Sequence, residues 1–128
     1  MLSFIVFLLC LSIQSSYQNN TIVFQSGESG YSCIRIPALL TTSKGTLIAF
    51  GEARLFSCAD GTQIDIAYKR STDNGKTWSE LKILVRGNET GDAYTHAGNF
   101  APVQLRYNQR IRSEDHTSEL QSLAYLVC

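Results

Sequence analysis

Three charged side chains are of the types that could bind and cleave an anionic substrate: Arg35, Arg54 and Asp60. A planar guanidinium can hold a carboxylate through two parallel N–H···O bonds. A carboxyl group can deliver a proton to a departing oxygen when its surroundings bring its pKa toward neutrality. Each residue also has an ordinary alternative, because arginine usually lies at the surface and an aspartate before glycine commonly forms a turn. Their spacing alone assigns no role.

A second polar string, STDNGKTW at 71–78, has the composition of a tight turn. Asp and Asn side chains accept backbone N–H groups in turns, and glycine permits a positive φ where the chain reverses. The tryptophan can then pack beneath the turn. We expect the aspartate to hold the turn together, in preference to acting as a metal ligand or a general acid. The residues that define the string are Ser71, Asp73, Gly75, Thr77 and Trp78.

Alternating apolar and polar residues predict the elements that must position these groups. Strands are expected at 21–24, 34–40, 46–52, 64–70 and 81–85. Within 64–70, one face should carry Ile64, Ile66 and Tyr68, and the other Asp65, Ala67 and Lys69. No helix is predicted before residue 112. Consecutive antiparallel strands joined by tight turns are what a propeller blade needs, and a single blade requires neighbours to bury both of its faces.

Composition excludes several classes of protein. The 128 residues carry 11 basic and 11 acidic side chains, and a formal net charge of zero argues against a nucleic-acid binder. A hydrophobic fraction of 44% argues against disorder. With the first segment discounted, three cysteines are too few for a disulfide scaffold. His96 has no second ligand at metal-binding spacing, so we expect neither a metal nor an organic cofactor.

The amino-terminal residues 1–16, MLSFIVFLLCLSIQSS, are typical of a signal peptide. The apolar run is shorter than the roughly 20 residues that a membrane helix needs, so no membrane span is expected after signal removal. The alternative is a buried first strand or helix. Possible glycosylation sites at Asn19 and Asn88 agree with secretory passage. We therefore expect the secretory pathway, with a lysosomal, cell-surface or extracellular destination.

Residues 112–128, RSEDHTSELQSLAYLVC, differ in pattern from the rest of the chain. They resemble one reading frame of a common sequencing adapter, with a single mismatch at Asp115. The alternative is an amphipathic helix. The adapter interpretation makes this tail non-native and removes it from fold reasoning. The domain then comprises 17–111, the amino-terminal part of a longer protein.

Four motifs over residues 31–79 together resemble the exo-α-sialidase (neuraminidase) family of Asp-box propellers. The string YSCIRIP at 31–37 keeps the family's Arg-Ile-Pro, with the aromatic residue further upstream at Tyr31. The string GTLIAFGEAR at 45–54 is similar to the family's next strand, which ends in Glu-Ala-Arg. Asp60 stands six residues after Arg54, where the family has its catalytic aspartate, and 71–78 is similar to its Asp box.

The resemblance implies an all-β fold: the first blade and the start of the second of a six-bladed β-propeller. It implies a retaining glycoside hydrolase that releases terminal sialic acid from glycoproteins, glycolipids such as gangliosides, and oligosaccharides. By analogy, Arg35 is the first of three arginines that bind the substrate carboxylate, and Arg54 is an additional active-site arginine. Asp60 is the acid/base on a mobile loop. The Asp box, or BNR repeat, is structural and lies far from the site. The segment 98–103 resembles one that walls the N-acetyl pocket, with Phe100 in place of a proline.

Other parts of the family's machinery have no counterpart here. Its two further arginines, its tyrosine nucleophile and the glutamate partner of that tyrosine are expected beyond residue 111, since Tyr107 and Tyr125 lack the matching context. We therefore expect the 128-residue chain to be inactive by itself. The alternatives are a non-catalytic Asp-box propeller, which would be carbohydrate-binding or a sorting-receptor domain, and a trans-sialidase. Cys33 and Cys58 could form a disulfide or remain buried free thiols.

Overall fold

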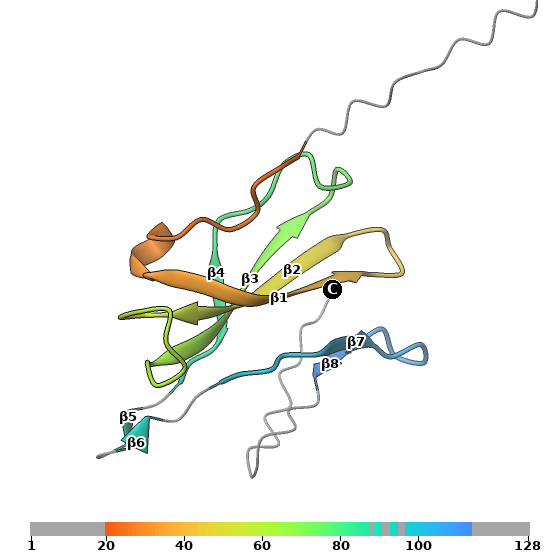
Figure 1. Ribbon diagram of the computed structural model, residues 1–128. Coiled ribbons are helices and arrows are strands. Elements are labelled where there is room, and N and C mark those ends of the chain that lie inside the picture. The colour runs from red at the N-terminus through yellow and green to blue at the C-terminus, as the bar shows by residue number, and fades with distance from the viewer. Residues whose placement is uncertain (1–19, 88, 91–92, 95–96, 114–128) are drawn as a thin grey trace, which may run out of the picture.

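The centre of the molecule is a four-stranded antiparallel sheet with strand order β1-β2-β3-β4. The computed structural model describes residues 20–87, 89–90, 93–94 and 97–113. Figure 1 shows the sheet, with a short two-stranded piece, β7 and β8, running past β1. The sheet strands are β1 (Cys33–Thr41), β2 (Leu47–Arg54), β3 (Ile64–Ser71) and β4 (Lys82–Val85). The remaining elements are η1 (Glu28–Gly30), β5 (Glu89–Thr90), β6 (Ala93–Tyr94), β7 (Pro102–Gln104) and β8 (Ile111–Ser113).

The predicted all-β fold is confirmed, as are four of the five predicted strands. The strand predicted at 21–24 is wrong. These residues form no strand. The ring of Phe24 lies against Gly51 of β2, and the Lys69 ammonium stands 5.6 Å from the centroid of that ring. Because this segment lies over a face of the sheet and not beside its edge, its alternating pattern does not lead to strand pairing.

The two faces of the sheet have separate cores, as the alternation in 64–70 predicted. On one face Ile48 and Phe50 pack with Ile111, and the ring centroids of Phe50 and Phe100 are 4.7 Å apart. On the other face, Tyr31 packs with two buried alanines of β2 and β3. The chain after β6 therefore covers one face, and the chain before β1 covers the other.

Strand β1 contains a bulge opposite Gly51 of β2. Pairing with β2 shifts between Arg35 and Ala38, and Ile36, inside this bulge, has a φ of 50°. That conformation is unfavourable for a β-branched residue. Gly51 lies opposite, where a Cβ would stand 2.7 Å from a methyl carbon of Ile34. Glycine at this position therefore allows β1 to approach β2 closely at the bulge.

The string at 71–78 forms a turn held by its own side chains. The Asp73 carboxylate accepts the Thr77 N–H at 2.9 Å and the Thr77 hydroxyl at 2.6 Å. The Ser71 hydroxyl donates to Asp73 at 2.8 Å, and the Trp78 indole donates to the Gly75 carbonyl at 3.1 Å. Hydrogen bonds from the Thr77 side chain and backbone and from Ser71 lower the pKa of Asp73 to about 2. Gly75 has a positive φ of 84° where the chain reverses, a conformation that glycine adopts without strain.

The register of the sheet separates this turn from Arg54, at the other end of β2. Ser71 pairs with Leu47 at the start of β2, whereas Ile64 pairs with Arg54 at its end. The turn and Arg54 are thus at opposite ends of the same two strands.

Several predictions fall on residues outside the described part of the chain. These are the signal peptide at 1–16, both glycosylation asparagines Asn19 and Asn88, His96, and positions 114–128 of the tail. Strand β8 crosses the predicted boundary between 111 and 112. Among the residues described, no helix has the length and apolar character to cross a membrane.

Candidate active site

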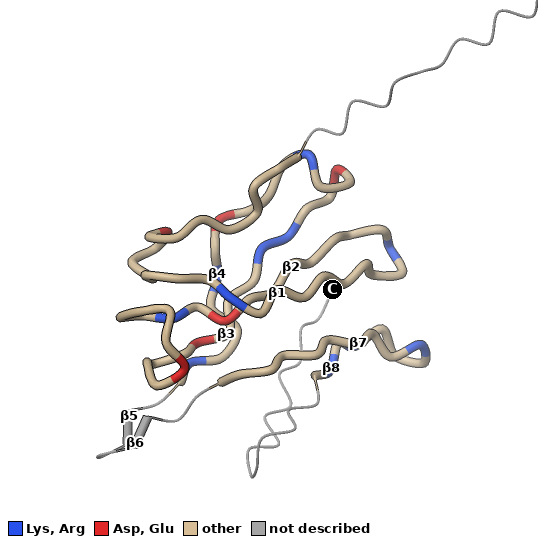
Figure 2. Tube along the Cα trace, viewed as in Figure 1, with Lys and Arg blue, Asp and Glu red and all other residues tan. Residues whose placement is uncertain are grey.

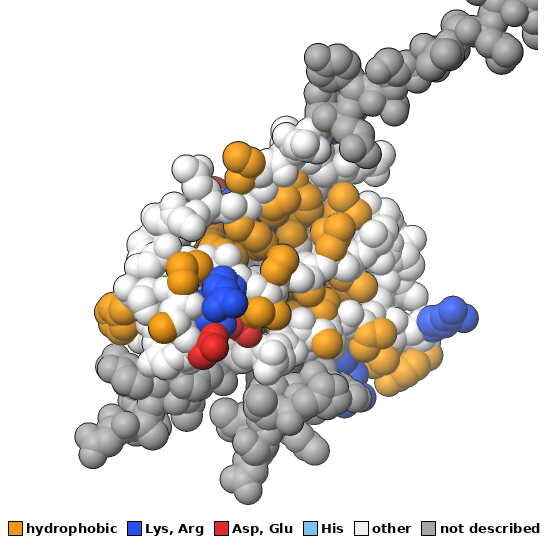
Figure 3. All heavy atoms as spheres, in the orientation of Figure 1, with side chains coloured by type: hydrophobic (Ala, Val, Ile, Leu, Met, Phe, Trp, Pro, Cys, Tyr) orange, Lys and Arg blue, Asp and Glu red, His pale blue; other side chains and the backbone are white. Residues whose placement is uncertain are grey.

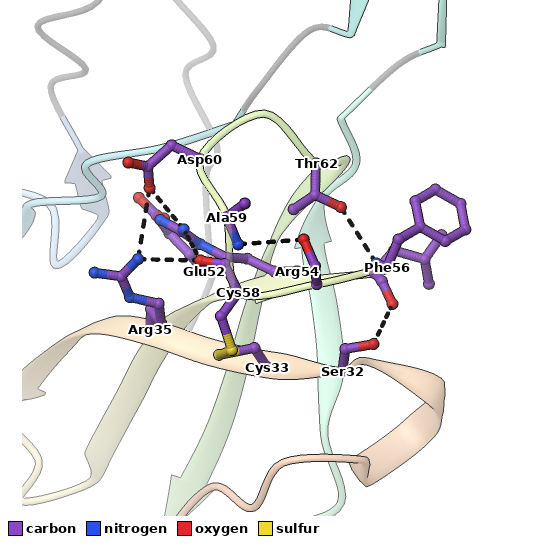
Figure 4. Close-up of a disulfide and its surroundings, with 12 residues drawn as sticks. Ser32, Cys33, Arg35, Glu52, Arg54, Phe56, Cys58, Ala59, Asp60 and Thr62 are labelled. Atoms are coloured by element: carbon purple, nitrogen blue, oxygen red, sulfur yellow. Dashed lines mark hydrogen bonds and ion pairs between the residues drawn. A yellow bond between two sulfur atoms is a disulfide. The ribbon is translucent and has the colours of Figure 1, made fainter.

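The predicted charged residues come together where β1 and β2 meet the 55–63 loop, which joins β2 to β3. Figure 4 shows that Arg35 from β1, Arg54 from β2 and Asp60 from the loop point toward one another. In Figure 2, basic and acidic residues lie close together along the backbone trace at this end of the sheet. Figure 3 shows basic and acidic side chains in contact on the surface, bordered by apolar side chains.

Arg54 is the buried member of the cluster. It ends β2, its side chain is 3% exposed, and each of its terminal nitrogens meets a carboxylate. One nitrogen, Nη2, lies 2.7 Å from Glu52 Oε2, and the other, Nη1, lies 2.6 Å from Asp60 Oδ1. Burial lowers the pKa of Arg54, but the hydrogen bonds to Glu52 and Asp60 outweigh that effect and raise the pKa above its ordinary value. The guanidinium is therefore a fixed positive charge.

Arg35 is the accessible arginine. Its side chain is 46% exposed, and its Nη1 lies 3.6 Å from Asp60 Oδ1. The same nitrogen donates to the Cys58 carbonyl at 3.1 Å, and Arg54 Nη1 donates to that carbonyl at 2.6 Å. The two guanidiniums consequently share one backbone acceptor and one carboxylate. Much of the Arg35 guanidinium remains open to an external anion.

Asp60 presents its carboxylate to solvent. The side chain is 87% exposed although it contacts both arginines. An exposed carboxyl group in contact with both arginines can reach a molecule bound over them. Geometry alone therefore permits proton transfer at this point.

Glu52 is a component of the site that the sequence analysis did not single out. It is buried, and besides its contact with Arg54 it accepts the Asn99 N–H at 2.9 Å through Oε1. A Cβ at Gly98 would stand 3.2 Å from that same oxygen. The available signal was the Glu-Ala-Arg spacing, because residues two apart on a strand share a face. Glu52 thus links the arginine to the segment that follows β6.

Cys33 and Cys58 form a disulfide, with their Cα atoms 5.3 Å apart. The structure thereby decides between the bridge and the two free thiols that the sequence left open. Cys33 begins β1, two residues before Arg35, and Cys58 lies two residues before Asp60. The bridge therefore connects the strand that carries one arginine to the loop that carries the acid.

Comparisons with known proteins agree with this architecture, although no protein-family model matches the chain. A sialidase of Bacteroides fragilis is 37% identical over 70 residues, 54% of this chain and 13% of that protein. An anhydrosialidase of Macrobdella decora is 47% identical over 68 residues, 50% of this chain and 9% of that protein. The crystal structure of the NanB sialidase from Streptococcus pneumoniae superposes with a TM-score of 0.58 at 26% identity, covering 71% of this chain and 17% of that one.

The chain is therefore similar to sialidases over about half of its length, and its fold corresponds to part of a sialidase β-propeller. The resemblance inferred from residues 31–79 is confirmed at this level. The chain spans between 9% and 17% of the length of these relatives, so its described residues correspond to a small part of such a protein.

Proposed function

We propose that this chain contributes part of the substrate site of an exo-α-sialidase, a glycoside hydrolase that releases terminal sialic acid. The observation that carries the proposal is the convergence of two guanidiniums and one exposed carboxyl group on a single point of the surface. Arg54 and Arg35 approach the same oxygen of Asp60, at 2.6 and 3.6 Å. The similarity of the chain to sialidases supports the proposal at the level of the family.

Arg35 and Arg54 supply the positive charge that attracts the carboxylate of a sialic acid. Arg35 makes the direct contact, since its guanidinium is accessible and can form two parallel hydrogen bonds to a carboxylate. Arg54 already contacts carboxylates through both terminal nitrogens, so it reaches substrate only when its contact with Asp60 is exchanged. The substrates are sialylated glycoproteins, glycolipids and oligosaccharides.

Asp60 acts as the acid/base of the reaction. It gives its proton to the departing glycosidic oxygen as the bond to the anomeric carbon breaks, and later takes a proton from the attacking water. The nucleophile of sialidases is a tyrosine, which we assign to another blade of the complete propeller. An uncharged nucleophile suits this substrate because a carboxylate nucleophile would be repelled by the substrate's own carboxylate.

The proposal is tested on the complete propeller that contains these residues, with a fluorogenic sialoside as substrate. We expect Arg35→Ala to raise KM and Asp60→Ala to lower kcat by about 10²- to 10⁴-fold. Arg70→Ala is the matched control, because Arg70 is exposed on β3 near the opposite end of the sheet. Unchanged KM in the first variant or unchanged kcat in the second would overturn the assignment.

Two outcomes would identify the alternative functions. Binding of sialosides by the complete protein without turnover would indicate a carbohydrate-binding propeller, and transfer of sialic acid to an added sugar in preference to water would indicate a trans-sialidase. The 128-residue chain alone should show no turnover. Activity in that chain would mean that its own residues supply a nucleophile.

We also place the protein in the secretory pathway. Glycosidase digestion and mass measurement of the secreted material would detect glycans at Asn19 or Asn88 and removal of the leader.

A further inference from the structure

We propose that the Cys33–Cys58 disulfide is a positioning device for this site: it fixes the Cys58 carbonyl, and that carbonyl orients both arginines beside Asp60. The inference rests on the proposed function for its catalytic consequence. It rests on the contacts of the described residues for its geometry.

One end of the bridge is firmly anchored. Cys33 is buried and pairs with Arg54 in the sheet register, and Arg35, two residues on, pairs with Glu52. Cys33 and Arg35 therefore lie on the same face of β1, the face that Glu52 and Arg54 occupy on β2. Figure 4 shows that the disulfide runs from β1 to the loop beside the charged side chains of the site.

The other end of the bridge carries the shared acceptor. The Cys58 carbonyl accepts Arg54 Nη1 at 2.6 Å and Arg35 Nη1 at 3.1 Å, which uses both lone pairs of the oxygen. Two guanidiniums repel each other, so their closeness depends on the oxygens placed between them, this carbonyl and the Asp60 carboxylate. Displacing the carbonyl would remove one of those two acceptors.

Hydrogen bonds between backbone and side chains of the 55–63 loop do less to fix residue 58. Two of them run within the loop, from the Phe56 N–H to Thr62 and from the Ala59 N–H to Ser57, each at 3.2 Å. The Ser32 hydroxyl reaches the loop from the strand side, but it binds the Leu55 carbonyl at the loop's beginning. The disulfide is thus a covalent tie from β1 to the middle of the loop, next to the acid, beside the hydrogen bond that Arg35 donates to the Cys58 carbonyl.

Reduction should therefore uncouple the acid from the arginines. A dithiol reductant transfers two electrons and two protons to the bridge, leaving two cysteine thiols and an oxidised, cyclic dithiol. A displacement of about 1 Å in a catalytic constellation can cost roughly a hundredfold in rate, so we expect kcat/KM to fall by about ten- to a hundredfold. Both kcat and KM should change, because the bridge orients the acid and the carboxylate-binding arginine together.

The test uses the complete propeller and compares it with the double variant Cys33→Ser/Cys58→Ser, each with and without dithiothreitol. Assays are run below the melting transition of both proteins. We expect the reductant to lower the activity of the native protein, re-oxidation to restore it, and the double variant to be low throughout and insensitive. Ser32→Ala, which removes a non-covalent tie to the same loop, is the matched control and should retain activity and sensitivity.

Hydrogen exchange of the loop, residues 55–63, is measured on the same samples and separates this inference from the proposed function. Faster exchange in the loop after loss of the bridge, accompanied by the fall in kcat/KM, supports the inference. Unchanged exchange overturns it, and so does faster exchange with full activity. If the oxidised protein shows no sialidase activity at all, the proposed function fails, and sialic-acid binding with and without the bridge then decides the positioning role.

Discussion

The contact between Tyr31 and Asp65 gives a sharp test of how the blade is held together. The Tyr31 hydroxyl donates to Asp65 Oδ2 at 2.6 Å, and the Gly87 N–H donates to the other oxygen at 2.8 Å. Asp65 is 1% exposed and Tyr31 is 6% exposed. This carboxylate, near the start of β3, joins that strand to the chain before β1 and to Gly87, which follows β4. The substitution Tyr31→Phe removes the hydroxyl oxygen and keeps the ring.

The expected loss of stability depends on which groups remain near Asp65 Oδ2 once the Tyr31 hydroxyl is removed. Arg86 Nη1 lies 3.7 Å away, and its side chain is 71% exposed, so it offers weak compensation. A hydrogen bond to a charged group contributes about 1.5–3 kcal/mol, and an orphaned buried acceptor costs a similar amount. We expect Tyr31→Phe to lower the free energy of unfolding by about 2 kcal/mol, which corresponds to about 1 M in the urea midpoint at an m value of about 2 kcal/mol/M.

The assay is urea unfolding of the complete propeller, followed by hydrogen exchange of the amides of β3, the strand that carries Asp65. Burial and the hydrogen bond with Asp65 raise the pKa of Tyr31 to about 12, from 10.0. A raised folded-state pKa means that this stabilisation is complete below pH 10 and disappears as the pH rises through about 12. The difference in the free energy of unfolding between the native protein and the Tyr31→Phe variant should be constant below pH 10 and should disappear as the pH rises through about 12.

A double-mutant cycle supplies the control. In a background of Asp65→Ala, the substitution Tyr31→Phe should cost little, since the carboxylate that accepted the hydroxyl is gone. Equal costs in both backgrounds, or a cost below about 0.5 kcal/mol in the native background, would refute the reasoning.

Three further predictions concern the site, the bulge and the turn. Glu52→Gln should lower the free energy of unfolding by about 3 kcal/mol in urea titrations, because it removes the buried negative charge beside Arg54. Gly51→Ala should cost about 1–3 kcal/mol, as the new Cβ would stand 2.7 Å from Ile34; a thermal melt would show whether β1 can move to relieve the clash. The low pKa of Asp73, about 2, means that its stabilisation of the turn is complete above pH 3.8 and is lost as the pH falls toward 2. Carboxyl NMR titration should therefore find Asp73 ionised at pH 3, and a normal titration midpoint would contradict the turn geometry.

Local patterns in the sequence were sufficient to predict most of the blade. Four strands were recoverable because alternation reports which side chains share a face, and that depends on near neighbours alone. The self-contained turn at 71–78 was recoverable for the same reason, since its hydrogen bonds run between residues a few positions apart. Similarity of the strings around Arg35, Arg54 and Asp60 to those of sialidases supplied their candidate roles.

Contacts between residues that are far apart in the sequence were determined by the tertiary structure. The alternating residues at 21–24 lie over a face of the sheet and form no strand. Strand pairing requires a free sheet edge beside the segment, and the local pattern contains no information about where such an edge lies. The pairing of Cys33 with Cys58 depends on how the 55–63 loop returns to β1. The role of Glu52 depends on Asn99, 47 positions away in the chain, arriving beside it. These contacts join segments that the sequence separates, so spacing along the chain could not reveal them.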